Sequence, residues 1–169
     1  MKTRPLFAWI GALIAAGGVF LFSRNMTILS VRNMDRAASF HFAISPSEEV
    51  TLFHTNSVYD ARVEEIFQVI EGNMVLKSVK SNSAAVMEYY GFEDTAPSQP
   101  LHRNMGPAFS VQTSLRQDQG LRIGGRTLRW RELARAGDRI LVSVDQVTSV
   151  KFLWWKIFHK DKINPSTER

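Results

Sequence analysis

Chemically active side chains are few in this sequence, and histidines are the first of them. The 169-residue chain contains four histidines and no cysteine, which removes disulfides, thiolate metal sites and cysteine nucleophiles. His41 and His54 could face each other on adjacent strands, while His102 and His159 lie further along the chain. Two imidazoles without further ligands do not form a zinc site, so we expect no metal and no other cofactor.

His54, Ser57 and Asp60 include the residue types of a hydrolase triad. They lie within seven residues of one another, however, and no nucleophile elbow or oxyanion-hole motif accompanies them. No phosphate-binding loop or dinucleotide-binding fingerprint is present either. We therefore predict no catalytic residues. A membrane-tethered hydrolase or metal-dependent enzyme is the weakest alternative, and it would require His41, His54 or His102 to converge with Glu65.

Glu65 is the polar residue whose place in the pattern stands out. If residues 63–70 form a strand, Glu65 shares one face with three apolar side chains, where a carboxylate needs a hydrogen-bonding or cationic partner. The preceding segment could fold back and supply donors. We predict a small polar site for a ligand or partner at His54, Asn56, Ser57 and Glu65. The structural alternative is that Glu65 only ties down the loop that precedes its strand.

Short runs rich in β-branched and aromatic residues follow Asn25, and turn signals separate them. Strands of this kind with short turns predict an all-β fold, either a small β-sandwich or a barrel-like domain. The predicted strands are Ser39–Ile44, Val50–His54, Val63–Ile70, Met74–Lys80, Phe109–Leu115, Gly120–Ile123, Thr127–Arg131 and Arg139–Val144.

Two hairpins are expected within this pattern. Gly124 and Gly125 would supply the positive φ angles of a two-residue turn, which places Leu121 opposite Leu128. A second turn is expected at residues 71–73.

Two other segments are not expected to be strands. Residues 130–136 could form a short helix that Gly137 ends. Residues 89–107 contain three prolines, which indicate a long irregular connection. Loops of this length are often functional or mobile, and a solvated crossover is an equal alternative.

An uncharged run at residues 6–22 predicts one N-terminal membrane helix. Its seventeen residues span about 25 Å, slightly less than a hydrocarbon core, and snorkelling of Arg4 and Arg24 would close the gap. A cleaved signal peptide is the alternative, with small residues at 15–17, but the apolar run continues beyond them. Lys2 and Arg4 favour a cytoplasmic N-terminus and an exported domain, held at the cytoplasmic membrane on its periplasmic or extracellular side.

A second membrane contact is indicated by residues 150–158, VKFLWWKIF. The run is too short to span, whereas tryptophans beside lysines suit a membrane interface with anionic headgroups. Membrane-interface contacts are therefore expected from Lys151, Trp154, Trp155 and Lys156. The equal alternative is a last strand that packs both faces into the core.

The basic composition does not indicate a nucleic-acid partner. The formal net charge is +5, but residues 35–94 hold ten acidic and four basic residues, whereas residues 103–169 hold six acidic and thirteen basic ones. The basic residues are scattered through strand-like segments rather than clustered on a helix. We divide the chain into a membrane anchor at 1–24, an extracytoplasmic β-rich domain at 25–160 and a tail at 161–169.

The stretch from residue 53 to residue 92 resembles one family of exported proteins. It carries Asn-Ser-Val at 56–58, Val-Glu-Glu-Ile-Phe at 63–67 and Ala-Ala-Val-Met at 84–87. This order is similar to the domain-of-unknown-function family numbered eighteen-fifty. Its members are small exported proteins encoded beside TRAP (tripartite ATP-independent periplasmic) transporters of the TAXI type. The family pattern is His-Ser-Val, then Pro-Val-x-Glu-x-Phe and a Gly-Ala-Gly turn, and the matching residues are Ser57, Val58, Val63, Glu65 and Phe67.

The sequence departs from this pattern in three places. Asn56 stands in place of the histidine, Arg62 in place of the proline, and residues 83–85 in place of the glycines. Asparagine does not titrate near neutrality, so no proton-coupled role is expected at this position. The resemblance implies a gene encoded beside transporter genes more than it implies a mechanism.

The combined expectation is a single-pass accessory protein. Its exported domain would associate with a transporter membrane subunit or with the solute-binding protein of that transporter. An anchor, one small domain, opposite charges in its two halves and the lack of a catalytic set favour docking over turnover. The alternative is a small-ligand receptor whose pocket contains Asn56, Glu65 and residues 89–107.

Overall fold

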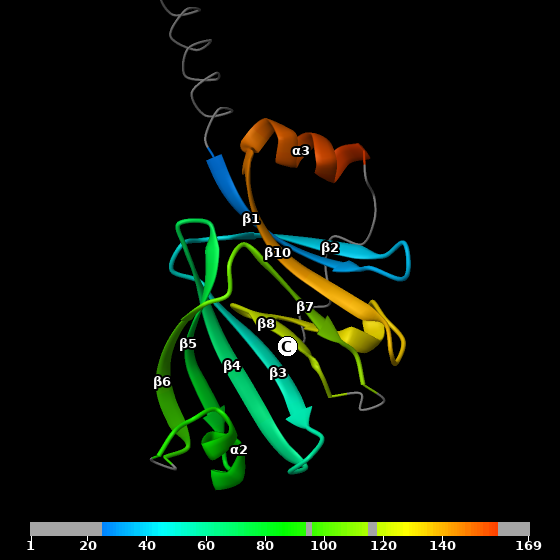
Figure 1. Ribbon diagram of the computed structural model, residues 1–169. Coiled ribbons are helices and arrows are strands. Elements are labelled where there is room, and N and C mark those ends of the chain that lie inside the picture. The colour runs from blue at the N-terminus through cyan, green and yellow to red at the C-terminus, as the bar shows by residue number, and fades with distance from the viewer. Residues whose placement is uncertain (1–24, 94–95, 115–117, 159–169) are drawn as a thin grey trace, which may run out of the picture. The chain divides into compact units, whose positions relative to one another are not determined.

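The structure is a computed structural model that describes residues 25–93, 96–114 and 118–158 (Figure 1). The predicted membrane helix, the tail and His159 lie outside these ranges, and no helix within them is long and apolar enough to cross a bilayer. The described residues belong to two compact units. The larger is the β domain, Thr27–Asp145, and the smaller includes residues 146–158.

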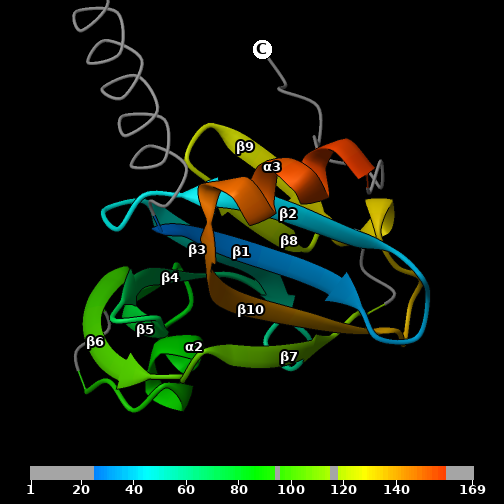
Figure 2. The ribbon, with the colours of Figure 1, turned by 90° about the horizontal axis from the view of Figure 1, so that it is seen from above.

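The described strands form two antiparallel sheets, which confirms the predicted all-β fold. The four-stranded sheet has the order β2-β1-β10-β7, and Figure 2 shows β1 and β10 side by side within it. The six-stranded sheet has the order β6-β5-β4-β3-β8-β9. The strands are β1 (Asn25–Asn33), β2 (Ser39–Ile44), β3 (Glu49–Asn56), β4 (Ala61–Ile70), β5 (Asn73–Ser81), β6 (Ser98–Asn104), β7 (Ala108–Gln112), β8 (Gly120–Ile123), β9 (Arg126–Arg129) and β10 (Arg139–Thr148). The helices are α2 (Ala84–Tyr89), the 3₁₀ helix η1 (Trp130–Glu132) and α3 (Ser149–Phe158).

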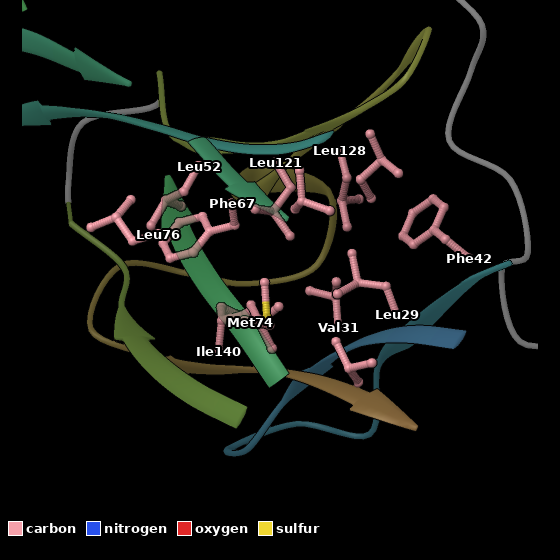
Figure 3. Packing of buried hydrophobic residues seen from close by; sticks show 14 of the residues in the cluster. Leu29, Val31, Phe42, Leu52, Phe67, Met74, Leu76, Leu121, Leu128 and Ile140 are labelled. Atoms are coloured by element: carbon pink, nitrogen blue, oxygen red, sulfur yellow. The ribbon is translucent and has the colours of Figure 1, made fainter. Parts of the chain in front are cut away.

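Alternation of side chains along the strands gives each sheet one apolar face. In β2, Phe40, Phe42 and Ile44 are buried, whereas the residues between them are only half-buried. The apolar faces of the two sheets meet in one cluster, as Figure 3 shows for Phe42 from one sheet and for Leu121 and Leu128 from the other. Full burial of each large side chain contributes about 1.5–3 kcal/mol, so this interior is the main source of stability.

The predicted hairpin at Gly124 and Gly125 is confirmed by the register, which pairs Leu121 with Leu128. Of the two glycines only Gly124 adopts a positive φ, of 55°, whereas the sequence reasoning expected both to do so. A Cβ atom at Gly124 would lie 2.7 Å from Glu48 Oε1. Glycine is therefore favoured there by conformation, whereas the end of the flexible Glu48 side chain could move aside.

The second predicted hairpin has a turn of two residues. Ile70 pairs with Asn73, which leaves Glu71 and Gly72 as the turn, with φ angles of 51° and 76°. Positive φ angles at both positions match the right-handed twist of the flanking strands.

The predicted irregular connection at residues 89–107 is wrong in its central part. Ser98–Asn104 forms β6, which pairs with β5 at the edge of the six-stranded sheet. Pro100 is tolerated because an edge strand bonds on one side only, and the register shifts between Leu76 and Ser78 beside it. The prolines therefore mark an edge strand and not the absence of regular structure.

Two further elements differ from the prediction. The strand β1 was missed because Ile28 and Leu29 are both fully buried, so the segment does not alternate. The helix predicted at residues 130–136 is shorter and is the 3₁₀ helix Trp130–Glu132. Gly137 follows it with a φ of 89°, a conformation that glycine readily adopts.

A polar group, which we call the Asp138 cluster, joins the buried residues Asn33 and Asp138 to the exposed residues Arg36 and Arg135. The Oδ2 atom of Asp138 accepts hydrogen bonds from Asn33 Nδ2 at 2.9 Å, Arg36 Nε at 2.6 Å and the backbone N–H of Arg135 at 2.9 Å. The Arg135 backbone, then Asn33 and Arg36, lower the pKa of Asp138 to about 2.

Asn33 links this cluster to the backbone on both sides. Its Nδ2 atom also donates to the carbonyl of Leu133 at 3.1 Å, and its Oδ1 atom accepts from the backbone N–H groups of Asp35 and Arg36. One buried side chain thus joins the turn after β1 to the segment before β10.

Candidate functional site

The loop between β3 and β4 is shaped by Asn56. Asn56 pairs with Ala61, and its Oδ1 atom accepts hydrogen bonds from the backbone N–H groups of Val58 at 2.9 Å and Tyr59 at 3.2 Å. Such a side-chain bond to the next residues is the usual way in which asparagine stabilises a tight turn. Asp60 completes the loop with a positive φ of 50°. The asparagine that departs from the family pattern therefore has a structural role.

A surface depression of about 350 Å³ lies at this loop. Three of the four predicted site residues, His54, Asn56 and Ser57, line it. Tyr89, the last residue of α2, lines it from another part of the chain, and Figure 1 shows α2 at the same end of the sheet as the loop. The remaining lining residues are Thr55, Val58 and Tyr59.

The fourth predicted residue, Glu65, is held by a different partner. Glu65 pairs with Leu52 in β3, four positions along the strand from the Asn56–Ala61 pair, which corresponds to about 13 Å. The hydroxyl of Tyr90 donates a hydrogen bond to Glu65 Oε1 at 2.5 Å. Burial, and then the Glu65 carboxylate, raise the pKa of Tyr90 well above its usual range.

Glu65 therefore does not line the depression itself. Tyr90 directly follows Tyr89, and the two rings meet edge to face with their centroids 5.8 Å apart. The bond to Glu65 thus fixes the residue next to Tyr89. The geometry differs both from a direct Glu65–Asn56–Ser57 cluster and from a bond between Glu65 and the preceding loop. A binding role for these residues stays a prediction.

The helix α2 is a rigid support for Tyr89. Ser83 caps it, with Oγ accepting from the backbone N–H of Val86 at 3.4 Å. Val86 and Met87 of the same helix are fully buried. The helix is therefore anchored to the core while Tyr89 remains in solvent.

Large apolar side chains surround the depression, and we call Val58, Tyr59 and Tyr89 the tip patch. Their exposed fractions are 78%, 42% and 71%. Exposed apolar and tyrosine side chains gathered at one place are typical of contact surfaces. The sequence did not single out Tyr59, although it belongs to the β3–β4 loop, and it indicated Tyr89 only as one end of residues 89–107 in the receptor alternative. The folded chain brings α2 to the β3–β4 loop.

A second depression, of about 460 Å³, is lined mostly by charged and polar residues. Arg62 and Glu64 line it, and Arg62 Nη2 lies 3.2 Å from Glu64 Oε1. Arg122 approaches the same carboxylate at 3.6 Å, and both guanidinium groups lie over the ring of Phe53. Arg62, Arg122 and Glu64 are paired with one another, so this depression is a weaker candidate for a binding site than the tip patch.

The histidine pair that sequence reasoning brought together is not formed. His41 lies in β2 of one sheet, with Nδ1 at 3.0 Å from Ser30 Oγ, whereas His54 lies in β3 of the other sheet. His102 lies on the edge strand β6, exposed to solvent. Among the described residues, no group of three or more histidine, cysteine, aspartate or glutamate side chains could hold a metal ion.

The segment at residues 150–158 is not the core strand that one of the two interpretations expected. Ser149–Phe158 forms the helix α3. Its apolar residues recur at the spacing of a helix and do not alternate as in a strand, and Val150, Leu153 and Trp154 are exposed. The helix leaves the membrane-interface interpretation of Lys151 and Trp154 as a prediction. The side chains of Trp155 and Lys156 lie outside the described structure.

Comparisons with known proteins do not add an identity to this geometry. No model of a known protein family matches the chain, and no functionally described protein or solved structure is significantly similar to it. The family resemblance in residues 53–92 accordingly stays an expectation.

Proposed function

We propose that the chain is a membrane-anchored, extracytoplasmic accessory protein whose β domain binds a protein partner through the tip patch. The observation that supports this most is the exposure of Val58, Tyr59 and Tyr89 around one depression. Aromatic side chains with an apolar body and a polar end are enriched in protein interfaces. The proposed partner is a transporter membrane subunit or its solute-binding protein, which follows from the family resemblance.

The arrangement favours a binding role over a catalytic one. The depression is lined by one histidine, one serine and no carboxylate. Glu65, the acidic residue predicted for this site, accepts a hydrogen bond from Tyr90 instead. A triad requires a base that is held by a third group beside the nucleophile, and no such arrangement joins these residues.

A pull-down from native membranes tests this function. The full chain, tagged at its C-terminus, is extracted in mild detergent and the co-purified proteins are identified by mass spectrometry. We expect a multi-span transporter subunit or a solute-binding protein, and we expect Val58→Asp or Tyr89→Ala to remove it. Met34→Ala is the matched control, because Met34 is also exposed, at 46%, but does not line the depression. Equal recovery with all three variants would contradict a partner site at the tip patch.

A small-ligand receptor is the second candidate, and the volume of the depression favours it. About 350 Å³ lies at the lower end of the range of small-molecule sites, and His54, Asn56 and Ser57 supply polar groups. A thermal-shift screen with small carboxylic acids tests this alternative. A rise in melting temperature that Tyr89→Ala removes would support the receptor, and the absence of any shift would favour the protein partner.

A further inference from the structure

The helix α3 carries four exposed apolar side chains at the spacing of one helical face. They are Val150, Leu153, Trp154 and Ile157, which follow one another at intervals of three, one and three positions. Their exposed fractions lie between 47% and 60%. Positions i, i+3, i+4 and i+7 fall on the same side of an α-helix. The described helix thus has a continuous apolar stripe turned to solvent.

The length of α3 determines how it could meet a membrane. Its ten residues extend about 15 Å, half the thickness of a hydrocarbon core. A helix of this length cannot cross a bilayer. It can lie in the plane of the interface with its apolar stripe among the acyl chains.

The charge of this segment indicates which surface it meets. Between Gln146 and Lys160 the sequence contains three lysines and no acidic residue. Lys151 is exposed and lies three positions before Trp154, which places it at the border of the stripe. A lysine in this position can keep its ammonium group at the headgroups while its stem follows the apolar surface, and it is attracted by anionic lipids.

We propose that α3 is an interfacial helix that binds an anionic membrane surface, with Val150, Leu153, Trp154 and Ile157 inserted below the headgroups. The tryptophan at the edge of the stripe fits this position, because indole prefers the boundary between headgroups and acyl chains. A protein groove would also accept an i, i+3, i+4, i+7 stripe. The excess of lysine without any acid favours the lipid surface.

The absence of cysteine from the chain permits a direct test by single-cysteine labelling. The full chain is reconstituted in vesicles of phosphatidylcholine with or without phosphatidylglycerol, and carries an environment-sensitive fluorophore at Leu153→Cys or Ile157→Cys. Quenching by lipids brominated along the acyl chain reports the depth of the label. The measurement reports how deep the label lies and not whether the chain is attached to the vesicle. An N-terminal anchor that holds all variants at the vesicle therefore does not affect the result.

Two control labels lie at exposed polar positions. Lys151→Cys tests the border of the same helix, and Ser47→Cys tests the turn between β2 and β3. We expect quenching at Leu153→Cys and Ile157→Cys to exceed that at Lys151→Cys, and to be absent at Ser47→Cys. Adding Lys151→Glu to the Leu153→Cys chain should lower the inserted fraction in phosphatidylglycerol vesicles, by about fivefold in the equilibrium for each unit of charge lost.

Other results would overturn the proposal. Equal quenching at all four positions, or none at any position, would show that the stripe does not enter the membrane. Protection of Leu153→Cys that appears only after native membrane proteins are added would assign the stripe to a protein groove. Insertion that is equally strong without phosphatidylglycerol and with Lys151→Glu would remove the requirement for an anionic surface.

Discussion

The Asp138 cluster and the tip patch use their side chains in opposite ways. Asn33 and Asp138 are buried, and their polar atoms bond to neighbouring protein groups. Beside the tip patch, Asn56 bonds to its own loop, while Val58 and Tyr89 of the patch extend into solvent. Polar groups that are satisfied internally stabilise a fold, whereas exposed apolar groups do not. The comparison therefore separates residues that hold the domain together from residues that are available to a partner.

The largest effect on stability is expected from Asn33→Ala. The substitution removes two donated and two accepted hydrogen bonds and leaves buried groups without partners. Each unsatisfied buried group costs about 1–3 kcal/mol, so the free energy of unfolding should fall by about 3 kcal/mol in urea denaturation. Asn73→Ala, which removes an exposed bond to Glu71, is the control and should cost well under 1 kcal/mol. Similar costs for both variants would contradict the structural role of the Asp138 cluster.

Acid should weaken the Asp138 cluster selectively. The pKa of Asp138 is lowered from 3.8 in the unfolded reference to about 2, so its carboxylate contributes stability above about pH 3.8. That contribution is lost as the pH falls through about 2, because protonation removes the charge that Arg36 and the Arg135 backbone bind. Melting temperatures measured from neutral pH to pH 2 should therefore fall more steeply for the native chain than for Asp138→Asn. Parallel curves would contradict the assignment.

The β8–β9 turn offers a matched pair of substitutions. Gly124→Ala should cost about 1–2 kcal/mol, because φ is positive; the flexible Glu48 side chain near the new Cβ can move aside. Gly125→Ala should be close to neutral, since nothing lies within 4 Å of its Cβ position. Chemical denaturation of both variants measures the difference. Equal costs would show that the turn has another conformation.

The hydrogen bond between Glu65 and Tyr90 is a structural contact that lies directly beside Tyr89 of the tip patch. A double-mutant cycle with Glu65→Gln and Tyr90→Phe should give a coupling energy of about 1 kcal/mol in unfolding experiments. Because Tyr90 adjoins Tyr89, either substitution should also weaken partner binding without abolishing it. A coupling energy near zero would mean that Glu65 does not hold this segment.

Sequence patterns predicted the parts of the fold that depend on local rules. Alternation located most strands, and the glycine pair located the β8–β9 hairpin, because a two-residue turn fixes the register of its strands. The edge strand β6 was missed, since the tolerance of Pro100 depends on which neighbours the sheet supplies. The strand β1 was missed because its buried residues do not alternate.

The candidate site was predictable only where its residues are close in sequence. His54, Asn56 and Ser57 lie at the end of β3 and at the start of the loop that follows it, and they line one depression. Tyr89 joins them from α2, and Tyr90 reaches Glu65 across 25 positions of the chain. Neither contact leaves a periodic pattern in the sequence. Pairings of this kind depend on tertiary packing, which one sequence does not reveal.

The most direct test of the tip patch is site-specific photo-crosslinking in native membranes. A photoreactive residue is placed at Val58 or Tyr89 of the full chain, and at Met34, which is also exposed, at 46%, as a control. The tip patch should give one discrete crosslinked product, identified as a transporter subunit or solute-binding protein, and Met34 should give none. Substitutions at these exposed positions should change the free energy of unfolding by no more than about 0.5 kcal/mol. Crosslinks that are absent at both tip positions, or equal at Met34, would contradict the proposal that this surface binds a partner.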